Sequence, residues 1–238
     1  MKTITPQRSL FISCPVEALM QGLYQAPTSM TSLKTHGDFG LGTFNGLDGE
    51  MIVLDGVVYR AEASGRIRPV DDAVETPFAC VTFFAPDTTE EPESPVNRER
   101  FWNFLRGLIP SPNMAYAVLI RGEFDLIHAR SVPAQQQGRP LVEAARNQVE
   151  FTFTDTRGSL VGFYTPEFIK SLVVPGFHLH FLNHDHTVGG HLLHCALGRV
   201  EIGLMHIPEI SVALPMTLDY LTADLSPDVQ KDLHQAER

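Results

Sequence analysis

The sequence has 238 residues, which is enough for one large domain or two small ones. Hydrophobic residues make up 43% and charged residues 19%, values typical of a globular protein that exclude a disordered or fibrous one. The formal net charge is −10, and no run of basic residues interrupts it. Because nucleic acids and anionic membranes are bound through clustered Lys and Arg, the charge disfavours both as partners.

The cysteines and the N-terminal segment indicate a cytoplasmic protein. Cys14, Cys80 and Cys195 are far apart and form no CxxC pair, which favours a reducing compartment over a disulfide framework. Pro6 and Pro15 interrupt the first residues, so that they do not resemble a signal peptide. No segment approaches the roughly 20 apolar residues of a membrane-spanning helix. We therefore expect a soluble cytoplasmic protein.

In the first half of the chain the pattern predicts mainly strands. Helical spacing of apolar residues predicts a short helix over residues 16–25. Four glycines and an Asp-Gly pair predict tight turns over residues 38–49. Residues 50–61 read as a hairpin joined at Asp55-Gly56, a strong two-residue turn signal. A strand at 78–84, a solvated acidic loop at 87–95 and a helix at 98–107 are expected next.

In the second half, strand patterns continue with few helices. Two strands are expected at 114–121 and 123–130, on either side of Gly122. Two more are expected at 149–153 and 159–163, with Arg157-Gly158 as the turn between them. The remaining predicted elements are a helix at 141–148, short strands at 176–182, 191–197, 200–204 and 209–214, and a helix at 226–237 that begins with a Ser N-cap and a Pro.

The order of these elements predicts the fold class. Strands outnumber helices, and the two do not alternate regularly. This favours a strand-rich α+β fold, with two mixed or antiparallel β-sheets and a few short helices, over a doubly wound parallel sheet. We expect an N-terminal mixed-sheet domain at residues 1–125 and a C-terminal sheet domain at 126–238, the second carrying a metal site.

The metal site is predicted from histidines: six of the ten in the chain lie between residues 178 and 194. His178 and His180 are two residues apart on a predicted strand, so both imidazoles point to the same face. The chain turns at Gly189-Gly190, and a returning antiparallel strand can bring His191 beside them. Three imidazoles with an open position are the arrangement that catalytic zinc commonly uses. We therefore expect a Zn²⁺ site.

The other histidines and the cysteine fit structural roles better. His184 and His186 form a second H-x-H, but their polar neighbours indicate an exposed loop. Cys195 lies in an apolar run and is expected to be a core thiol. The sequence contains neither a G-x-S-x-G motif for a serine hydrolase nor a phosphate-binding P-loop.

Three blocks of sequence together resemble the α-acetolactate decarboxylase family. They are GTFNGLDGEMI at 42–52, RSVP at 130–133 and PGFHLHF…GGH within 175–191, and the resemblance runs from about Ser29 to the C-terminus. It implies that His178, His180 and His191 bind the metal. It also brings Glu50, Arg130 and a C-terminal glutamate, here Glu237, into the same site, and implies a two-domain homodimer with mixed sheets. His194, like His184 and His186, is not at a ligand position of the family.

The resemblance also implies a reaction: decarboxylation of 2-acetolactate to acetoin and CO₂, a step of the acetoin and butanediol pathway, with zinc as a Lewis acid. Loss of CO₂ from a β-keto acid leaves negative charge on the ketone oxygen, where such an ion is stabilising. Arg130 is expected to pair with the substrate carboxylate, or else to orient or protonate the enediolate. Glu50 is expected either to bind the metal or to govern the proton delivered to carbon.

Two other functions are compatible with the histidine cluster. One is a cupin-like metal-dependent oxygenase, in which H-x-H also opens the metal motif; that pattern requires a nearby Glu, and only Asp185 is close in sequence. The other is a non-catalytic protein that stores or senses metal ions. The second gives no role to Glu50 and Arg130, which are far from the histidines in sequence.

Overall fold

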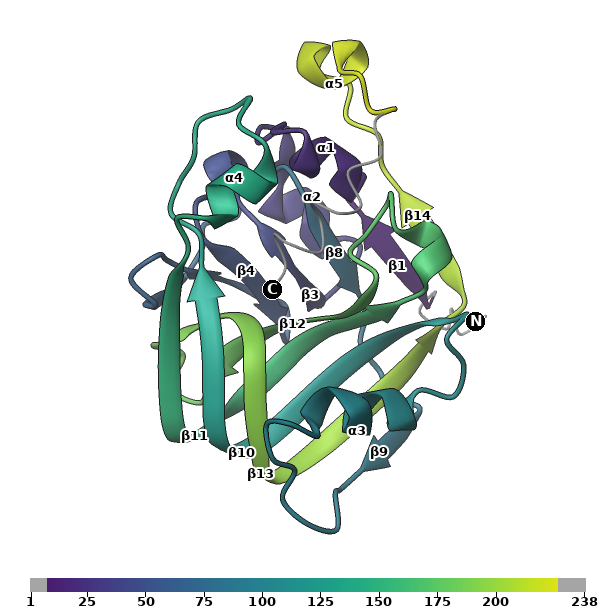
Figure 1. Ribbon diagram of the computed structural model, residues 1–238. Coiled ribbons are helices and arrows are strands. Elements are labelled where there is room, and N and C mark those ends of the chain that lie inside the picture. The colour runs from purple at the N-terminus through teal and green to yellow at the C-terminus, as the bar shows by residue number, and fades with distance from the viewer. Residues whose placement is uncertain (1–7, 227–238) are drawn as a thin grey trace.

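Two β-sheets form the body of the protein in this computed structural model, which describes residues 8–226 (Figure 1). The seven-stranded sheet is mixed, since its edge strand runs parallel to its neighbour and the other pairs are antiparallel. Its strands, in spatial order, are β14 (Glu209–Val212), β1 (Ser9–Ile12), β8 (Ala79–Thr82), β3 (Phe39–Thr43), β4 (Glu50–Leu54), β5 (Val57–Ala61) and β6 (Ile67–Pro69).

The five-stranded sheet is antiparallel throughout. Four of its strands pair in a closed cycle, because β10 contacts both β11 and β13 while β12 joins those two. Its strands are β10 (Ala115–Ser131), β11 (Val149–Thr165), β12 (Gly176–Asn183), β13 (Gly189–Ile207) and β9 (Thr88–Glu90). A further two-stranded sheet joins β2 (Thr28–Ser29) to β7 (Glu75–Thr76). The strand-rich α+β prediction is thus confirmed.

The helices of the described residues are short. They are α1 (Val16–Met20), α2 (Met30–Lys34), α3 (Phe101–Leu108), α4 (Leu141–Ala145) and α5 (Leu218–Thr222), with 3₁₀ turns at Asn45–Leu47 and Glu167–Ile169. The predicted helices at 16–25, 98–107 and 141–148 are confirmed, although α1 and α4 are shorter than expected. The helix α2 and the strand β1 were not predicted. The helix predicted at 226–237 lies outside the described residues, apart from Ser226.

Three hydrophobic layers explain why β3, β4 and β8 are buried on both faces. The central layer lies between the two sheets, where Ile52 of β4 packs with residues of β10, β11 and β13. A second layer covers the outer face of the seven-stranded sheet, where Met51 and Val53 pack with Leu33 of α2. A third lies on the five-stranded sheet beneath α3. Because successive side chains of β4 alternate between layers, Glu50 shares the central side with Ile52.

The hairpin predicted at Asp55-Gly56 is confirmed. The strands β4 and β5 pair from Leu54 opposite Val57 to Glu50 opposite Ala61. Both turn residues have positive φ angles, 52° at Asp55 and 77° at Gly56, as a two-residue type I′ turn requires. The turn therefore fixes the position of Glu50 at the far end of the ladder.

The predicted breaks within the long strands are wrong. The pairs predicted at 114–121 and 123–130, and at 149–153 and 159–163, each form one continuous strand, as do the segments 191–197 and 200–204 of β13. The supposed turn glycine Gly158 lies inside β11, and a Cβ there would be 2.4 Å from the carbonyl oxygen of Leu182. Glycine therefore serves close strand packing here, and the ladder bonds on both sides outweigh the local turn preference.

The glycine-rich segment at 38–49 was also only partly predicted. Residues 39–43 form the buried strand β3 instead of a turn, and the turns begin after it. A Cβ at Gly40 would lie 2.1 Å from the carbonyl oxygen of Cys80 on β8, so the glycine is needed for pairing. The acidic loop at 87–95 is exposed as expected, although three of its residues form β9.

The long strand β10 crosses the predicted domain boundary. The predicted boundary between residues 125 and 126 falls inside β10, and the division into two domains stays a prediction. Among residues 8–226, no helix has the length and apolar character needed to cross a membrane.

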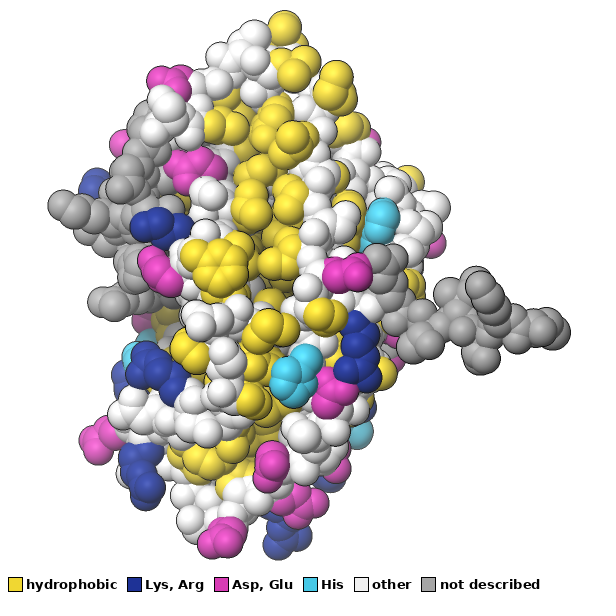
Figure 2. All heavy atoms as spheres, turned by 90° about the vertical axis from the view of Figure 1, so that its right-hand side faces the viewer, with side chains coloured by type: hydrophobic (Ala, Val, Ile, Leu, Met, Phe, Trp, Pro, Cys, Tyr) yellow, Lys and Arg dark blue, Asp and Glu magenta, His cyan; other side chains and the backbone are white. Residues whose placement is uncertain are grey.

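One face of the molecule carries a band of hydrophobic side chains (Figure 2). It lies on the side of β14 and α5, where β14 is the edge strand of the seven-stranded sheet. The exposed large hydrophobic side chains of this segment are Ile210, Leu214, Met216, Leu218 and Leu221. Exposed apolar groups that cluster in this way are typical of protein interfaces.

Gly162 provides a test of the close packing between β11 and β12. A Cβ at this position would lie 2.0 Å from the carbonyl oxygen of His178. We expect Gly162→Ala to lower the free energy of unfolding by about 3 kcal/mol, because the backbone of β12 must move. Urea unfolding followed by circular dichroism measures this. Gly107→Ala is the control: Gly107 lies in α3 with no atom near its Cβ position, and alanine should be neutral or slightly stabilising there. Equal stability of the Gly162→Ala variant and the native protein would contradict the packing argument.

Candidate active site

Strand register brings the three predicted histidines together. His180 of β12 lies directly opposite His191 of β13 in the antiparallel ladder, so their side chains point to the same face. His178 precedes His180 by two residues on β12 and shares that face. All three are buried. The arrangement predicted from the sequence is therefore present.

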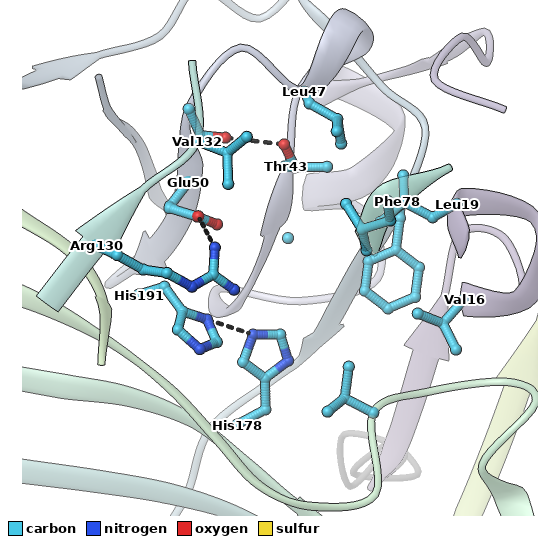
Figure 3. Close-up of a pocket in the computed structure, with 14 residues that line it drawn as sticks. Val16, Leu19, Thr43, Leu47, Glu50, Phe78, Arg130, Val132, His178 and His191 are labelled. Carbon is cyan, nitrogen blue, oxygen red and sulfur yellow. Dashed lines mark hydrogen bonds and ion pairs between the residues drawn. The ribbon is translucent and has the colours of Figure 1, made fainter. Parts of the chain in front are cut away.

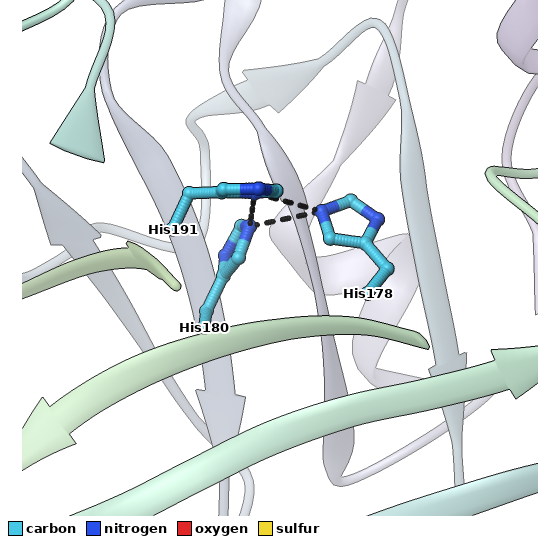
Figure 4. Close-up of side chains that lie close together, drawn as sticks. All are labelled: His178, His180 and His191. Atoms are coloured by element: carbon cyan, nitrogen blue, oxygen red, sulfur yellow. Dashed lines mark hydrogen bonds between the residues drawn. The ribbon is translucent and has the colours of Figure 1, made fainter. Parts of the chain in front are cut away.

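The ring nitrogens of these residues converge on one point (Figure 4). Nε2 of His178 lies 3.2 Å from Nε2 of His180 and 3.1 Å from Nδ1 of His191, and the third distance is 3.3 Å. Two imidazole nitrogens on a tetrahedral zinc ion, each at about 2.0–2.1 Å, are about 3.3 Å apart. The donor atoms and their spacing thus fit a divalent ion such as zinc.

A backbone contact fixes the orientation of His180. Its Nδ1 lies 2.7 Å from the carbonyl oxygen of Met51 on β4, and since a carbonyl only accepts, Nδ1 carries the proton and donates. The lone pair of Nε2 is then directed at the other two imidazoles. A partner of this kind on the outer ring nitrogen is usual for histidines that bind metals.

The environment keeps the imidazoles neutral. Burial, and after it the charge of Arg130, lowers the pKa of His178 to about 3. Burial and the charge of His178 hold the pKa of His180 well below its usual value, although the hydrogen bond to Met51 acts in the opposite direction. Neutral imidazole is the form that binds a metal ion.

Glu50 and Arg130 form a buried ion pair beside the histidines. Nη1 of Arg130 lies 3.2 Å from Oε1 of Glu50, and Oε2 of Glu50 lies 3.7 Å from Nε2 of His180. Glu50 begins β4 and Arg130 lies near the end of β10, so the pair joins the two sheets. Glu50 and Arg130 are 80 residues apart in sequence, and the fold brings them together at one site.

A β-bulge in β13 sets the position of His191 relative to Arg130. His128 pairs with His194, but Ala129 pairs with Leu192, so Leu193 has no partner on β10. As a result Arg130 lies opposite His191. With an uninterrupted register, Arg130 would lie opposite Leu192, and His191 would point to the other face.

The site opens into a pocket between the sheets (Figure 3). One side is polar and carries Glu50, Arg130, His178, His191 and Thr43, whose hydroxyl donates to the carbonyl oxygen of Gly49 at 2.8 Å. The opposite side is apolar and consists of Val16 and Leu19 of α1, Phe78 just before β8, Leu141 of α4 and Val174 in the segment before β12. A small molecule with one charged end and short alkyl groups suits such a pocket.

The other residues considered from the sequence lie outside the cluster or outside the described residues. His184 and His186 are exposed, as predicted, and His194 is not part of the cluster but stacks on His128, with ring centroids 6.3 Å apart. Cys195 is buried in the core, as expected. Glu237 lies outside the described residues. The sequence reasoning missed the apolar wall, since neither Val16 nor Phe78 carries a motif that separates pocket residues from core residues.

Comparison with known proteins agrees with this site. The family model described as alpha-acetolactate decarboxylase matches residues 10–227. The chain belongs to the alpha-acetolactate decarboxylase family. A relative of that name from Methanosarcina mazei is 40% identical over 224 residues, which cover 94% of this chain and 78% of the relative. Another from Bacillus subtilis strain 168 is 35% identical, with 98% and 92% of the two chains covered.

The solved structures agree with the sequence comparison. The crystal structure of alpha-acetolactate decarboxylase from Bacillus subtilis strain 168 matches with a TM-score of 0.92 and 34% identity. The match covers 96% of this chain and 99% of that one. The protein is therefore an enzyme, a carboxy-lyase of the alpha-acetolactate decarboxylase family. This favours a decarboxylase over the oxygenase and the metal-storage protein considered from the sequence.

The low pKa of His178 predicts a pH dependence of stability in the metal-free protein. Its pKa is about 3 in the folded chain and about 6.5 when unfolded, so the unfolded state binds more protons between these values. The free energy of unfolding should therefore fall as the pH drops below about 6.5. Replacement by His178→Gln should reduce this slope by up to about 1.4 kcal/mol per pH unit. Urea unfolding after chelation, at several pH values, tests this; identical slopes would contradict a buried neutral His178.

Proposed function

We propose that this enzyme decarboxylates 2-acetolactate to acetoin and CO₂, a step of acetoin biosynthesis, with a zinc ion held by His178, His180 and His191. The observation that carries the proposal is the convergence of three imidazole nitrogens beside the buried pair of Arg130 and Glu50. Membership of the family supports the substrate. Three neutral imidazoles with an open fourth position are a donor set that catalytic zinc uses.

When bound, a divalent ion at this site supplies a Lewis acid for the negative charge that develops on a substrate oxygen. In the reaction the bond between C2 and the carboxylate carbon breaks. Its electron pair moves toward the ketone oxygen, and the resulting enediolate then takes a proton at C2 to become acetoin. The protein residues must therefore hold the carboxylate, exclude water and control one proton.

Arg130 is suited to hold the substrate carboxylate. Its guanidinium is buried and presents five N–H donors in a planar fork, which pairs well with two carboxylate oxygens. The ion pair with Glu50 fixes the guanidinium at the polar side of the pocket. In a buried site an attraction of this kind is screened little by water, so it contributes strongly to binding and orientation.

Glu50 is suited to govern the proton delivered to carbon. Its carboxylate lies between the Arg130 guanidinium and the His180 ring, at 3.2 Å and 3.7 Å. A carboxyl group in this position can hold a proton next to the reacting carbon or act as a further metal ligand. The family resemblance adds Glu237 as another acidic group of the site.

The apolar side of the pocket is suited to the two methyl groups of acetolactate. Val16, Leu19, Phe78 and Val174 line it, so short alkyl groups lose contact with water there while the carboxylate lies at the polar side. The same wall keeps water away from the enediolate.

The proposed roles predict different losses for two variants. His191→Ala should lose both the metal and the activity, because two nitrogens hold zinc poorly. Arg130→Ala should keep stoichiometric metal but lower kcat/KM by about 100- to 1000-fold, since the charge that orients the carboxylate is gone. Metal analysis by plasma emission and a colorimetric acetoin assay on acetolactate measure both quantities. The control is His184→Ala, an exposed histidine of the same segment, which should leave both unchanged. Full turnover by Arg130→Ala, or full metal content in His191→Ala, would contradict the assigned roles.

We also propose that the enzyme is a cytoplasmic homodimer. Three cysteines, all buried and free of disulfides, support a reducing compartment. The dimer is supported by the hydrophobic band beside the edge strand β14, where Met216 is 82% and Leu218 75% exposed. A second copy can cover such a band in a two-fold arrangement, in which the same residues contribute from both chains.

The dimer proposal predicts that charges in the band dissociate it. Each large apolar side chain buried at an interface contributes about 1.5–3 kcal/mol, so the double variant Met216→Glu, Leu218→Glu should weaken the dimer at least about tenfold. Sedimentation velocity at several protein concentrations measures the dissociation. Val57→Glu, a 40% exposed apolar residue of β5, is the control and should remain dimeric. An unchanged dimer in the double variant would rule out this face as the interface.

A further inference from the structure

Ser131 lies between two residues that line the pocket, Arg130 and Val132, but does not line the pocket itself. It is the last residue of β10 and its side chain has no exposure to solvent. The hydroxyl Oγ donates a hydrogen bond of 3.0 Å to the carbonyl oxygen of Ala61. A buried serine hydroxyl needs a hydrogen-bond partner, and here the partner lies on β5, which pairs with the strand that carries Glu50.

Ala61 is the last residue of β5 and lies directly opposite Glu50 in the ladder between β4 and β5. The bond from Ser131 therefore joins the end of the strand that carries Arg130 to the end of the hairpin that carries Glu50. Arg130 and Glu50 in turn contact each other at 3.2 Å. The four residues form a closed loop of contacts: Arg130 to Ser131 by covalent bonds, Ser131 to Ala61, Ala61 to Glu50, and Glu50 to Arg130.

We propose that Ser131 is a positioning residue that sets the placement of the Arg130 guanidinium relative to Glu50 and the pocket. This inference rests on the proposed function, since it gives Ser131 a role only through Arg130. The apolar layer between the sheets attracts without direction, so it does not by itself fix how one sheet slides over the other. A hydrogen bond does, because its energy falls steeply with distance and angle.

A second polar contact acts at the same end of β4. Nδ1 of His180 donates to the carbonyl oxygen of Met51, next to Glu50, at 2.7 Å. The bond from Ser131 holds β10 against the hairpin, and the bond from His180 holds β12 against it. Loss of the first should therefore displace Arg130 more than the three histidines, because His191 is also paired with His180 of β12. A displacement of about 1 Å of a group that orients the substrate can lower the rate by about 100-fold.

The test is Ser131→Ala, compared with the native enzyme in the metal-loaded state and well below the unfolding temperature. We expect full metal content and a fall in kcat/KM of about 10- to 100-fold. Ser13→Ala is the matched control: Ser13 is also a buried serine, and its Oγ accepts from the backbone N–H of Ala79 in the seven-stranded sheet. It should change kcat/KM less than threefold. If Ser131→Ala does not fold, Ser131→Cys, which keeps the size but donates weakly, replaces it with the same expectation.

A double-mutant cycle with Arg130→Ala separates positioning from a purely structural role. If Ser131 acts through Arg130, adding Ser131→Ala to Arg130→Ala should lower kcat/KM no further, because the group that it positions is absent. Multiplicative losses, or unchanged kinetics in Ser131→Ala while Arg130→Ala is impaired, would overturn this inference and leave the proposed function intact. Unimpaired kinetics in Arg130→Ala would instead refute the proposed function itself.

Discussion

The ladder between β12 and β13 is the constraint on which the site depends. It is short, but it sets His180 opposite His191, and the two-residue period of a strand adds His178 on the same face. None of the three imidazoles could be moved singly to another position without losing this convergence. The closed cycle of β10, β11, β12 and β13 holds the ladder rigid, because each strand has a partner on either side. The cluster of three imidazoles is thus ordered by the backbone itself.

The second constraint is electrostatic. A carboxylate and a guanidinium are buried together at the junction of the two sheets, where an unpaired charge would be costly. Replacing both with apolar side chains would satisfy the core equally well, so the pair contributes little to folding that Leu and Met could not. Its value lies in presenting a fixed positive group beside neutral imidazoles. The arrangement thus favours function over the most stable core.

The sequence was sufficient to bring the three imidazoles together because strand periodicity is local. The H-x-H spacing places two imidazoles together without knowledge of the fold, and the glycine pair before His191 indicates the returning strand. Glu50 and Arg130 came from the family resemblance alone, since no local pattern shows that β4 and β10 meet. The wrongly predicted turns arose because the sequence does not show contacts between distant strands. Gly40 and Gly158 read as turn residues by themselves, whereas the neighbouring carbonyl oxygens that exclude a Cβ come from distant strands. The apolar wall was missed for the same reason.

The unpaired Leu193 has a consequence for how this enzyme can change in length. Between His191 and His194, β13 carries one residue more than the facing part of β10. Losing that residue would remove the bulge and leave a regular ladder in which Arg130 still lies opposite His191. Gaining a further residue there would shift the register by one and turn His191 away from His180. Homologous chains should therefore lose the extra residue between these two histidines more readily than they gain another.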